Sequence, residues 1–130
     1  MTVQEWLDGY ARAWEEKDPE MAAQLFTDDC VYRDQPFTEP RLRRDGVRQY
    51  WSEICAPQED PTVTFGAPVV SDDDRRAAAE FWVKMVNGGA QVTLTGILFL
   101  RFAAGGLCEE LREAWHFSEG FLDPAPSWGT

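Results

Sequence analysis

The sequence predicts an α+β domain in which helices cover one face of a curved sheet. Apolar residues follow a helical spacing up to about residue 56 and alternate with polar ones from about residue 61. Glycine-containing turns divide the alternating part, which is typical of antiparallel strands joined by hairpins. Helices followed by such strands favour a helix layer packed on a sheet, and these two layers can enclose a pocket.

The first helix is expected over residues 3–16, where apolar side chains recur every three or four positions. Thr2 and Glu5 have the spacing of a capping box at its start. A second, short helix follows, with Asp18 as N-cap and Pro19 in its first turn. The apolar residues of this region that we place in the core, together with one from the third helix, are Trp6, Leu7, Trp14, Phe26 and Trp51.

A turn over residues 27–29 and a short strand over residues 30–34 are expected next. In that strand Cys30, Tyr32 and Asp34 share one face. Asp45 is the expected N-cap of a third helix, which ends before Pro57. The apolar stripe of this helix consists of Val47, Tyr50, Trp51 and Ile54.

The remaining chain alternates with a period of two and predicts strands. Asn87-Gly88-Gly89 predicts a hairpin, and residues 104–106 predict the next turn. Around Phe81 and Trp82 the pattern leaves open which of the two faces inward. A last strand is expected from residue 107 to about residue 117. The tail, residues 120–130, is expected to be loose or draped over the surface of a single domain that spans residues 1–130, with its core over about residues 2–119.

Composition excludes several classes of protein. With 23 acidic and 12 basic residues the net charge is −11, which disfavours nucleic acid as a partner. The basic cluster at Arg41, Arg43, Arg44 and Arg48 is interpreted as a solvated surface. No apolar run approaches the ~20 residues that cross a bilayer, and the first residues do not have the pattern of a signal peptide. We therefore expect a cytoplasmic protein without a membrane partner.

No pattern of metal or cofactor binding is present. The 3 cysteines are widely spaced and outside any CxxC motif, so we interpret them as reduced core residues. His116 is the single histidine and has no G-x-S-x-G motif to support it, which favours a surface position. Phosphate-binding glycine loops are also missing. We expect no metal and no cofactor, which leaves cofactor-free chemistry or plain ligand binding.

Two carboxylates are candidate functional groups. On the last strand Glu113 shares a face with Leu111, Trp115 and Phe117, so it lies in an otherwise apolar row. It is either a pocket acid whose pKa is raised by burial, or an acid paired with an arginine or facing solvent. Asp34 follows Tyr32 at a strand end, where an apolar wall suits a general base, although an aspartate before a turn is also a common turn residue.

Four segments together resemble the nuclear transport factor 2-like superfamily, and within it the SnoaL-like and ketosteroid-isomerase-like members. They are Phe26–Asp34, Pro36–Arg41, Gly96–Phe102 and Leu111–His116, within a resemblance that spans about residues 2–119. It implies a cone-shaped roll in which three N-terminal helices pack on a strongly curved, mixed or antiparallel sheet. This fold hosts isomerases, cyclases, hydrolases, dehydratases and non-catalytic partners, so activity does not follow from it.

The resemblance also implies roles for individual residues. Asp34 falls at the position of the isomerases' proton-shuttling carboxylate, and Tyr10 at that of their oxyanion-binding tyrosine. Their second oxyanion donor, a protonated aspartate, is replaced by Leu98, which cannot donate a hydrogen bond, and this departure disfavours authentic steroid isomerase activity. Glu113 is the third candidate catalytic residue. The expected ligand-binding residues are Trp14, Tyr32, Trp51, Leu98, Leu111 and Trp115.

Two functions remain open at this point. The first is a small cofactor-independent enzyme, of isomerase, cyclase or lyase type, in which Asp34 abstracts a proton next to a carbonyl of a small hydrophobic substrate and Tyr10 or Glu113 stabilises the enolate. The second is a non-catalytic module that binds a hydrophobic ligand or serves a structural role as a dimer. A homodimer is expected in either case, because one sheet face is too apolar to stand in water; it carries Thr93, Thr95, Ile97, Phe99, Ala114 and His116.

Overall fold

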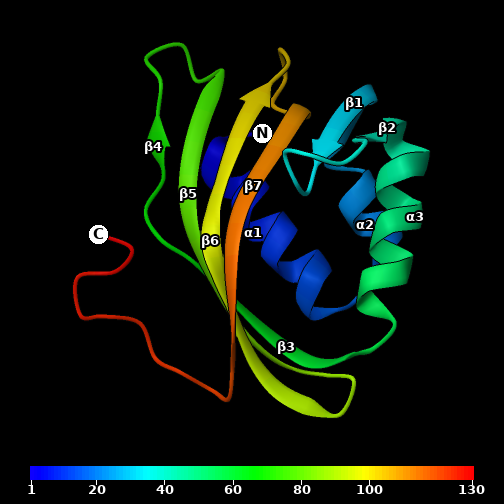
Figure 1. The fold of residues 1–130 in the computed structure, drawn as a ribbon. Helices are drawn as coiled ribbons and strands as arrows, with labels where there is room; N and C mark the ends of the chain where they lie inside the picture. The colour runs from blue at the N-terminus through cyan, green and yellow to red at the C-terminus, as the bar shows by residue number, and fades with distance from the viewer.

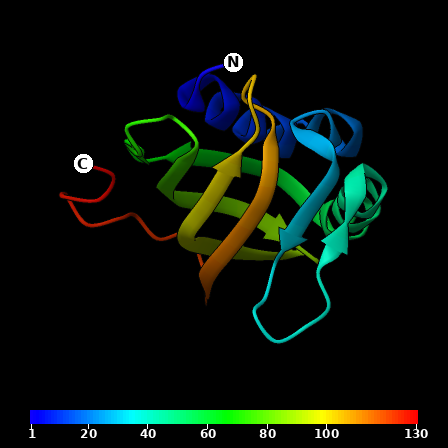
Figure 2. The same ribbon diagram turned by 90° about the horizontal axis from the view of Figure 1, so that it is seen from above.

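The computed structural model describes residues 1–130 and has the predicted α+β architecture. Helices α1 (Val3–Glu15), α2 (Pro19–Ala23) and α3 (Arg43–Cys55) pack on one face of a seven-stranded sheet (Figure 1). The strands are β1 (Phe26–Arg33), β2 (Arg41–Leu42), β3 (Gln58–Phe65), β4 (Val69–Val70), β5 (Arg76–Asn87), β6 (Ala90–Phe102) and β7 (Cys108–Glu119). Seen from above, the sheet curves around the helices (Figure 2).

The sheet is mixed. Its order is β2-β1-β7-β6-β5-β3, with β4 added to β5. Only β1 and β7 run parallel, and their register pairs Tyr32 with Leu111 and Arg33 with Arg112. All other pairs are antiparallel, and the long β5–β6 hairpin turns at Gly88 and Gly89, which both have positive φ. The parallel pair brings an early strand beside the last one, and this positions the functional site.

The helix starts follow from local capping. Thr2 and Glu5 form the predicted capping box of α1, with Thr2 Oγ1 accepting from the Glu5 backbone N–H at 3.1 Å. The Asp18 side chain caps α2 at the N–H of Met21, as expected. The expected Asp45 cap of α3 is wrong. Pairing of β2 with β1 fixes the chain up to Leu42, so α3 begins at Arg43 and Asp45 lies inside its first turn.

The expected turn over residues 27–29 is also wrong, because β1 begins at Phe26 and runs through this segment. The pairing with β7 shifts between Phe26 and Val31, so the polar residues of the segment bulge out of the ladder. Arg44 stabilises the bulge through the backbone oxygen of Phe26 and the carboxylate of Asp28, both at 2.8 Å. Helix α2 ends at Ala23, just before β1 begins at Phe26.

The core lies between the helices and the concave sheet face and contains 24 buried residues. All five residues expected there, Trp6, Leu7, Trp14, Phe26 and Trp51, belong to it. The open register on β5 is resolved by burial. Phe81 points into the core, whereas the Trp82 side chain lies on the outer face and donates to the backbone oxygen of Leu122 at 2.9 Å.

The C-terminal tail is draped over the outer sheet face (Figure 1). Trp128 packs edge-on against Trp82, and the Gly129 backbone oxygen accepts from the Ala67 N–H at 2.8 Å. Thr93 was placed on the face expected to pair in a dimer, but here the tail binds its hydroxyl and leaves it only 3% exposed. The tail therefore covers part of the face that was expected to contact a second copy of the chain.

Candidate functional site

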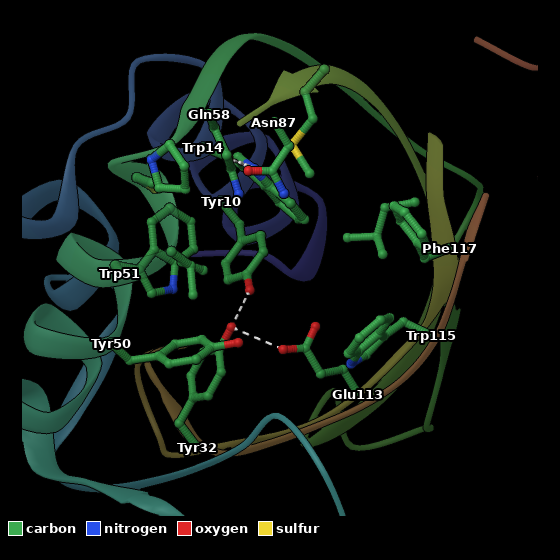
Figure 3. Close-up of a pocket in the computed structure, with 15 residues that line it drawn as sticks. Tyr10, Trp14, Tyr32, Tyr50, Trp51, Gln58, Asn87, Glu113, Trp115 and Phe117 are labelled. Carbon is green, nitrogen blue, oxygen red and sulfur yellow. Dashed lines mark hydrogen bonds between the residues drawn. The ribbon is translucent and has the colours of Figure 1, made fainter. Parts of the chain in front are cut away.

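A cavity of about 470 Å³ opens between the helices and the inner face of the sheet (Figure 3). This volume is within the range of small-molecule sites, roughly 300 to 1,000 Å³. Of its 15 lining residues, 11 are hydrophobic. They are Tyr10, Trp14, Tyr32, Tyr50, Trp51, Ile54, Cys55, Pro57, Gln58, Met85, Asn87, Leu94, Glu113, Trp115 and Phe117. The walls are therefore aromatic, and a single carboxyl group lies among them.

Helical and strand periodicity place the walls. Tyr10 and Trp14 are four residues apart on α1 and so share one of its faces. On β7 every second side chain, Glu113, Trp115 and Phe117, faces the cavity, as the sequence pattern indicated. The indole N–H of Trp14 donates to Gln58 Oε1 at 2.9 Å, which fixes that ring in the wall.

A chain of hydrogen bonds crosses the cavity (Figure 3). The hydroxyls of Tyr10 and Tyr32 are 2.8 Å apart, and the Tyr32 hydroxyl donates to Glu113 Oε1 at 3.3 Å. The other carboxyl oxygen of Glu113 is turned toward the open middle of the cavity (Figure 3). One oxygen is thus held by the protein, and the second is free to meet a ligand.

Glu113 holds its proton unusually tightly. Burial among apolar groups, and after it the negative charge of Asp34, raise its pKa from the ordinary 4.5 to about 8, against the opposing effect of the Tyr32 hydrogen bond. At neutral pH the carboxyl is therefore mostly protonated and able to donate a hydrogen bond. A pKa near the working pH also lets the group exchange protons in both directions.

The tyrosines of the cavity stay protonated. Burial, followed by the charge of Glu113, raises the pKa of both Tyr10 and Tyr32 well above the usual 10. The pKa of Tyr50 is raised for the same two reasons, with Asp34 as a further cause. Hydroxyl groups, rather than phenolates, thus face a ligand beside Glu113.

Asp34 lies next to Glu113 but behind the wall. The parallel register of β1 and β7 pairs Arg33 with Arg112. The residues that follow these two, Asp34 and Glu113, therefore also lie side by side. Asp34 is 9% exposed, and its Oδ1 has no hydrogen-bond partner. The closest cation is Arg41, whose Nε is 3.9 Å from that oxygen. Asp34 does not line the cavity, but its charge acts on two residues that do, Glu113 and Tyr50.

Six of the nine predicted site residues line the cavity, namely Tyr10, Trp14, Tyr32, Trp51, Glu113 and Trp115. Besides Asp34, Leu98 and Leu111 are absent from the wall. Both leucines point inward from the sheet, at 1% and 0% exposure, and are covered by the core. Strand parity correctly gave their inward direction but could not tell a side chain on the wall from one beneath it.

Several lining residues were missed. Tyr50 was on the predicted stripe of α3 and Phe117 on the predicted face of β7, so the same periodicity could have included them. Met85 and Leu94 likewise followed from strand alternation. Gln58 carried no such signal, because its role depends on the contact with Trp14 across the fold.

Of the other candidate groups, only Cys55 reaches the wall of the cavity. His116 is exposed, and the three cysteines are buried and unpaired. Nowhere in the structure do three or more His, Cys, Asp or Glu side chains gather as a metal site. None of the helices is both long and apolar enough to traverse a bilayer. The arginines near α3 form ion pairs, Arg44 with Asp28 and Arg48 with Glu20 and Asp45.

Three helices on a curved mixed sheet, enclosing an aromatic cavity, define a protein of the nuclear transport factor 2-like fold. The chain belongs to the SnoaL-like domain family, whose model matches residues 6–110. Comparison with curated protein sequences gave no match.

Solved structures of low sequence identity share this fold. SalBIII, an epoxide hydrolase/cyclase-like enzyme of pyran ring formation in the polyether salinomycin, is 18% identical with a TM-score of 0.78, over 90% of this chain and 95% of that one. RV0760c from Mycobacterium tuberculosis is 20% identical with a TM-score of 0.78, over 91% and 96%. A protein of ketosteroid isomerase-like fold from Catenulispora acidiphila is 20% identical with a TM-score of 0.75, over 88% and 86%.

Proposed function

We propose that this protein is an isomerase- or cyclase-type enzyme that moves a proton next to a carbonyl group of a small hydrophobic substrate, with Glu113 as the proton-transfer group. The observation that carries the proposal is the position of Glu113, a single carboxyl in an aromatic cavity with a pKa of about 8. A positioned carboxyl of matched pKa contributes roughly 10² to 10⁴ in rate. SalBIII, which shares the fold, is an epoxide hydrolase/cyclase-like enzyme.

The proton transfer uses only side chains of the cavity. In its ionised form Glu113 takes the proton from the carbon next to the carbonyl, and the electron pair of that C–H bond moves to give the enolate. The resulting carboxylic acid returns the proton to another carbon in an isomerase, or to the new alkoxide after the enolate carbon attacks a second carbonyl in a cyclase. Tyr10 and Tyr32 stay protonated, and their hydrogen-bond chain ends on Glu113 Oε1, so it holds this carboxyl in place and stabilises its ionised form.

Asp34 takes a different role in this proposal from the one that the sequence suggested. Since it does not line the cavity, we assign proton abstraction to Glu113 and make Asp34 a positioning residue. Its negative charge, alongside Glu113 and only loosely paired with Arg41 at 3.9 Å, keeps the proton on Glu113 near neutral pH. In this proposal Asp34 carries the negative charge and Glu113 carries the proton.

The proposed substrate class follows from the walls. A largely hydrophobic cavity rich in aromatic rings accepts a planar or ring-containing hydrophobic molecule, and the free oxygen of Glu113 faces its one reactive part, the C–H next to the carbonyl. RV0760c, which shares the fold, has been solved in complex with estradiol-17beta-hemisuccinate. We therefore propose neutral ring-containing ketones as the first compounds to test.

The test is deuterium exchange at the carbon next to the carbonyl of 2-acetylnaphthalene in D₂O. Wild type is expected to accelerate the exchange, and Glu113→Gln to lose the acceleration by about 10² or more. Asp34→Asn is the matched comparison, because it removes a neighbouring carboxylate and leaves Glu113 in place. It should retain exchange with a pH profile moved to lower pH. Full exchange by Glu113→Gln would contradict the proposal.

A non-catalytic ligand-binding module is the second candidate. It is favoured by the presence of a single carboxyl on the wall and by the Tyr10 hydroxyl already being bonded to Tyr32. In that case wild type binds 2-acetylnaphthalene, as followed by tryptophan fluorescence, and leaves its exchange rate unchanged.

We also propose a homodimer through the part of the outer sheet face that the tail leaves uncovered. Ile97 is 50% exposed there, with Phe99, Ala114 and His116 beside it on β6 and β7. Light scattering at micromolar concentration should give twice the mass of the chain. A monomer mass would contradict this assembly without affecting the assignment of Glu113.

A further inference from the structure

Residues 35–40, here called the rim loop, join the two walls of the cavity. On one side the backbone oxygen of Asp34, directly before the loop, accepts from Trp115 Nε1 at 3.1 Å. On the other side Arg41, directly after the loop, lies over the Tyr50 ring at 4.8 Å from its centre. Trp115 belongs to the sheet wall and Tyr50 to the helix wall. The rim loop therefore spans the edge of the cavity from one wall to the other.

The rim loop is held only at its ends. Residues 35–39 are exposed and make no hydrogen bond or ion pair with the rest of the protein. Figure 2 shows the segment projecting from the body between β1 and β2. Pro36 and Pro40 restrict the torsions of the loop, so it can move as a short stiff arm about its ends. Nothing in this conformation fixes the arm in place.

Phe37 stands at the tip of this arm and is 96% exposed, more than any other large hydrophobic residue. Leaving a phenylalanine in water forgoes the favourable free energy of its burial. The mouth of the cavity offers apolar surface nearby, because Trp115 and Phe117 line it and are still 41% and 58% exposed. An exposed aromatic ring on a free arm thus lies at the rim of an incompletely covered apolar site.

We propose that the rim loop closes over the cavity when a hydrophobic ligand binds, and that Phe37 then packs against the end of the ligand that Trp115 and Phe117 leave open. This inference rests on the proposed hydrophobic ligand of the cavity, but not on turnover. Closure buries Phe37 and part of the ligand together, and it excludes water from the neighbourhood of Glu113. Phe37 is then a specificity-determining residue that favours ligands with an apolar, uncharged outer end.

The first experiment compares Phe37→Ala with Val69→Ala in binding of 2-acetylnaphthalene, followed by tryptophan fluorescence. Val69 is a matched control because it is 76% exposed and does not line the cavity. Phe37→Ala is expected to raise Kd about tenfold, the effect of losing most of a buried aromatic contact. Val69→Ala should leave Kd unchanged. Both variants should keep the melting temperature of the wild type, since both side chains are exposed.

The second experiment measures closure directly in Phe37→Cys. The native thiols Cys30, Cys55 and Cys108 are buried, and burial raises the pKa of each. Because Cys55 also lines the cavity, native thiol reaction is measured in the wild type with and without ligand and subtracted, which leaves the signal of the introduced thiol. Saturating 2-acetylnaphthalene is expected to slow its reaction with a disulfide reagent at least severalfold. An unchanged Kd in Phe37→Ala, or an unprotected thiol at saturation, would overturn the proposed closure of the rim loop and leave the proposed function standing. No binding by wild type would overturn both.

Discussion

The buried proton of Glu113 should be visible in the pH dependence of stability. Folding raises the pKa of this group from 4.5 to about 8, so between these values the folded protein holds a proton that the unfolded chain has released. The free energy of unfolding therefore contains a contribution that is complete below pH 4.5 and lost as the pH rises toward 8. Glu113→Gln replaces the carboxyl by a neutral group of the same size and removes this dependence.

The magnitude follows from the shift. One pKa unit corresponds to about 1.4 kcal/mol, so a rise from 4.5 to about 8 sets an upper limit near 5 kcal/mol. Glu113 is only half-buried, and solvent at the mouth screens its charge. We therefore expect the wild type to lose about 2 to 3 kcal/mol relative to Glu113→Gln between pH 5 and pH 8.

The assay is urea unfolding of both proteins at pH 5, 6, 7 and 8, with the difference between their free energies of unfolding plotted against pH. Taking the difference cancels the pH dependence that comes from titratable groups present in both proteins. Glu119→Gln removes an exposed carboxyl from the same strand and controls for the loss of one charge. Curves of wild type and Glu113→Gln that stay parallel over this range would refute the buried-proton reasoning.

Three further outcomes are expected. Asp34→Asn should lower the pKa of Glu113 by about one unit because a like charge is removed, as a ¹³C NMR titration would show, and an unmoved midpoint would contradict the role of Asp34. Leu111→Ala should cost about 2 to 5 kcal/mol in urea unfolding, since the side chain is 0% exposed; a loss below about 1 kcal/mol would mean that the site collapses freely. Gly96→Ala should cost about 3 kcal/mol or more, because its Cβ would lie 2.0 Å from the backbone oxygen of Ala114, and a wild-type melting curve by circular dichroism would speak against this close approach.

Local chemistry made the helices and the inward faces of the strands predictable. The capping box at Thr2 and Glu5 defined the start of α1, and alternation on β7 placed Glu113 and Trp115 together. The start of α3 was not predictable, because it depends on the pairing of β2 with β1, whereas the sequence suggested a side-chain cap at Asp45. The pairing of two neighbouring strands overrode a local side-chain preference.

The site was only partly predictable for a similar reason. Parity shows which face a side chain takes but not which strand lies next to it, so the neighbourhood of Asp34 and Glu113 required the parallel pairing of β1 with β7. Periodicity likewise does not show whether an inward-facing side chain lines the cavity or lies beneath its wall. Leu98 and Leu111 face the same side as the cavity residues but lie under the core, while Asp34 ends behind the wall.

The hydrogen bond between Tyr32 and Glu113 joins residues that are 81 positions apart, across the β1–β7 pairing. Such a contact closes a very long loop, whose entropy is lost before the contact forms, and pairings of this separation slow folding. The β5–β6 hairpin and α1 can form from neighbouring residues. Glu113, in contrast, acquires its surroundings only when β1 pairs with β7. In a refolding experiment the perturbed titration of Glu113 should therefore develop with the slowest phase, after most of the secondary structure.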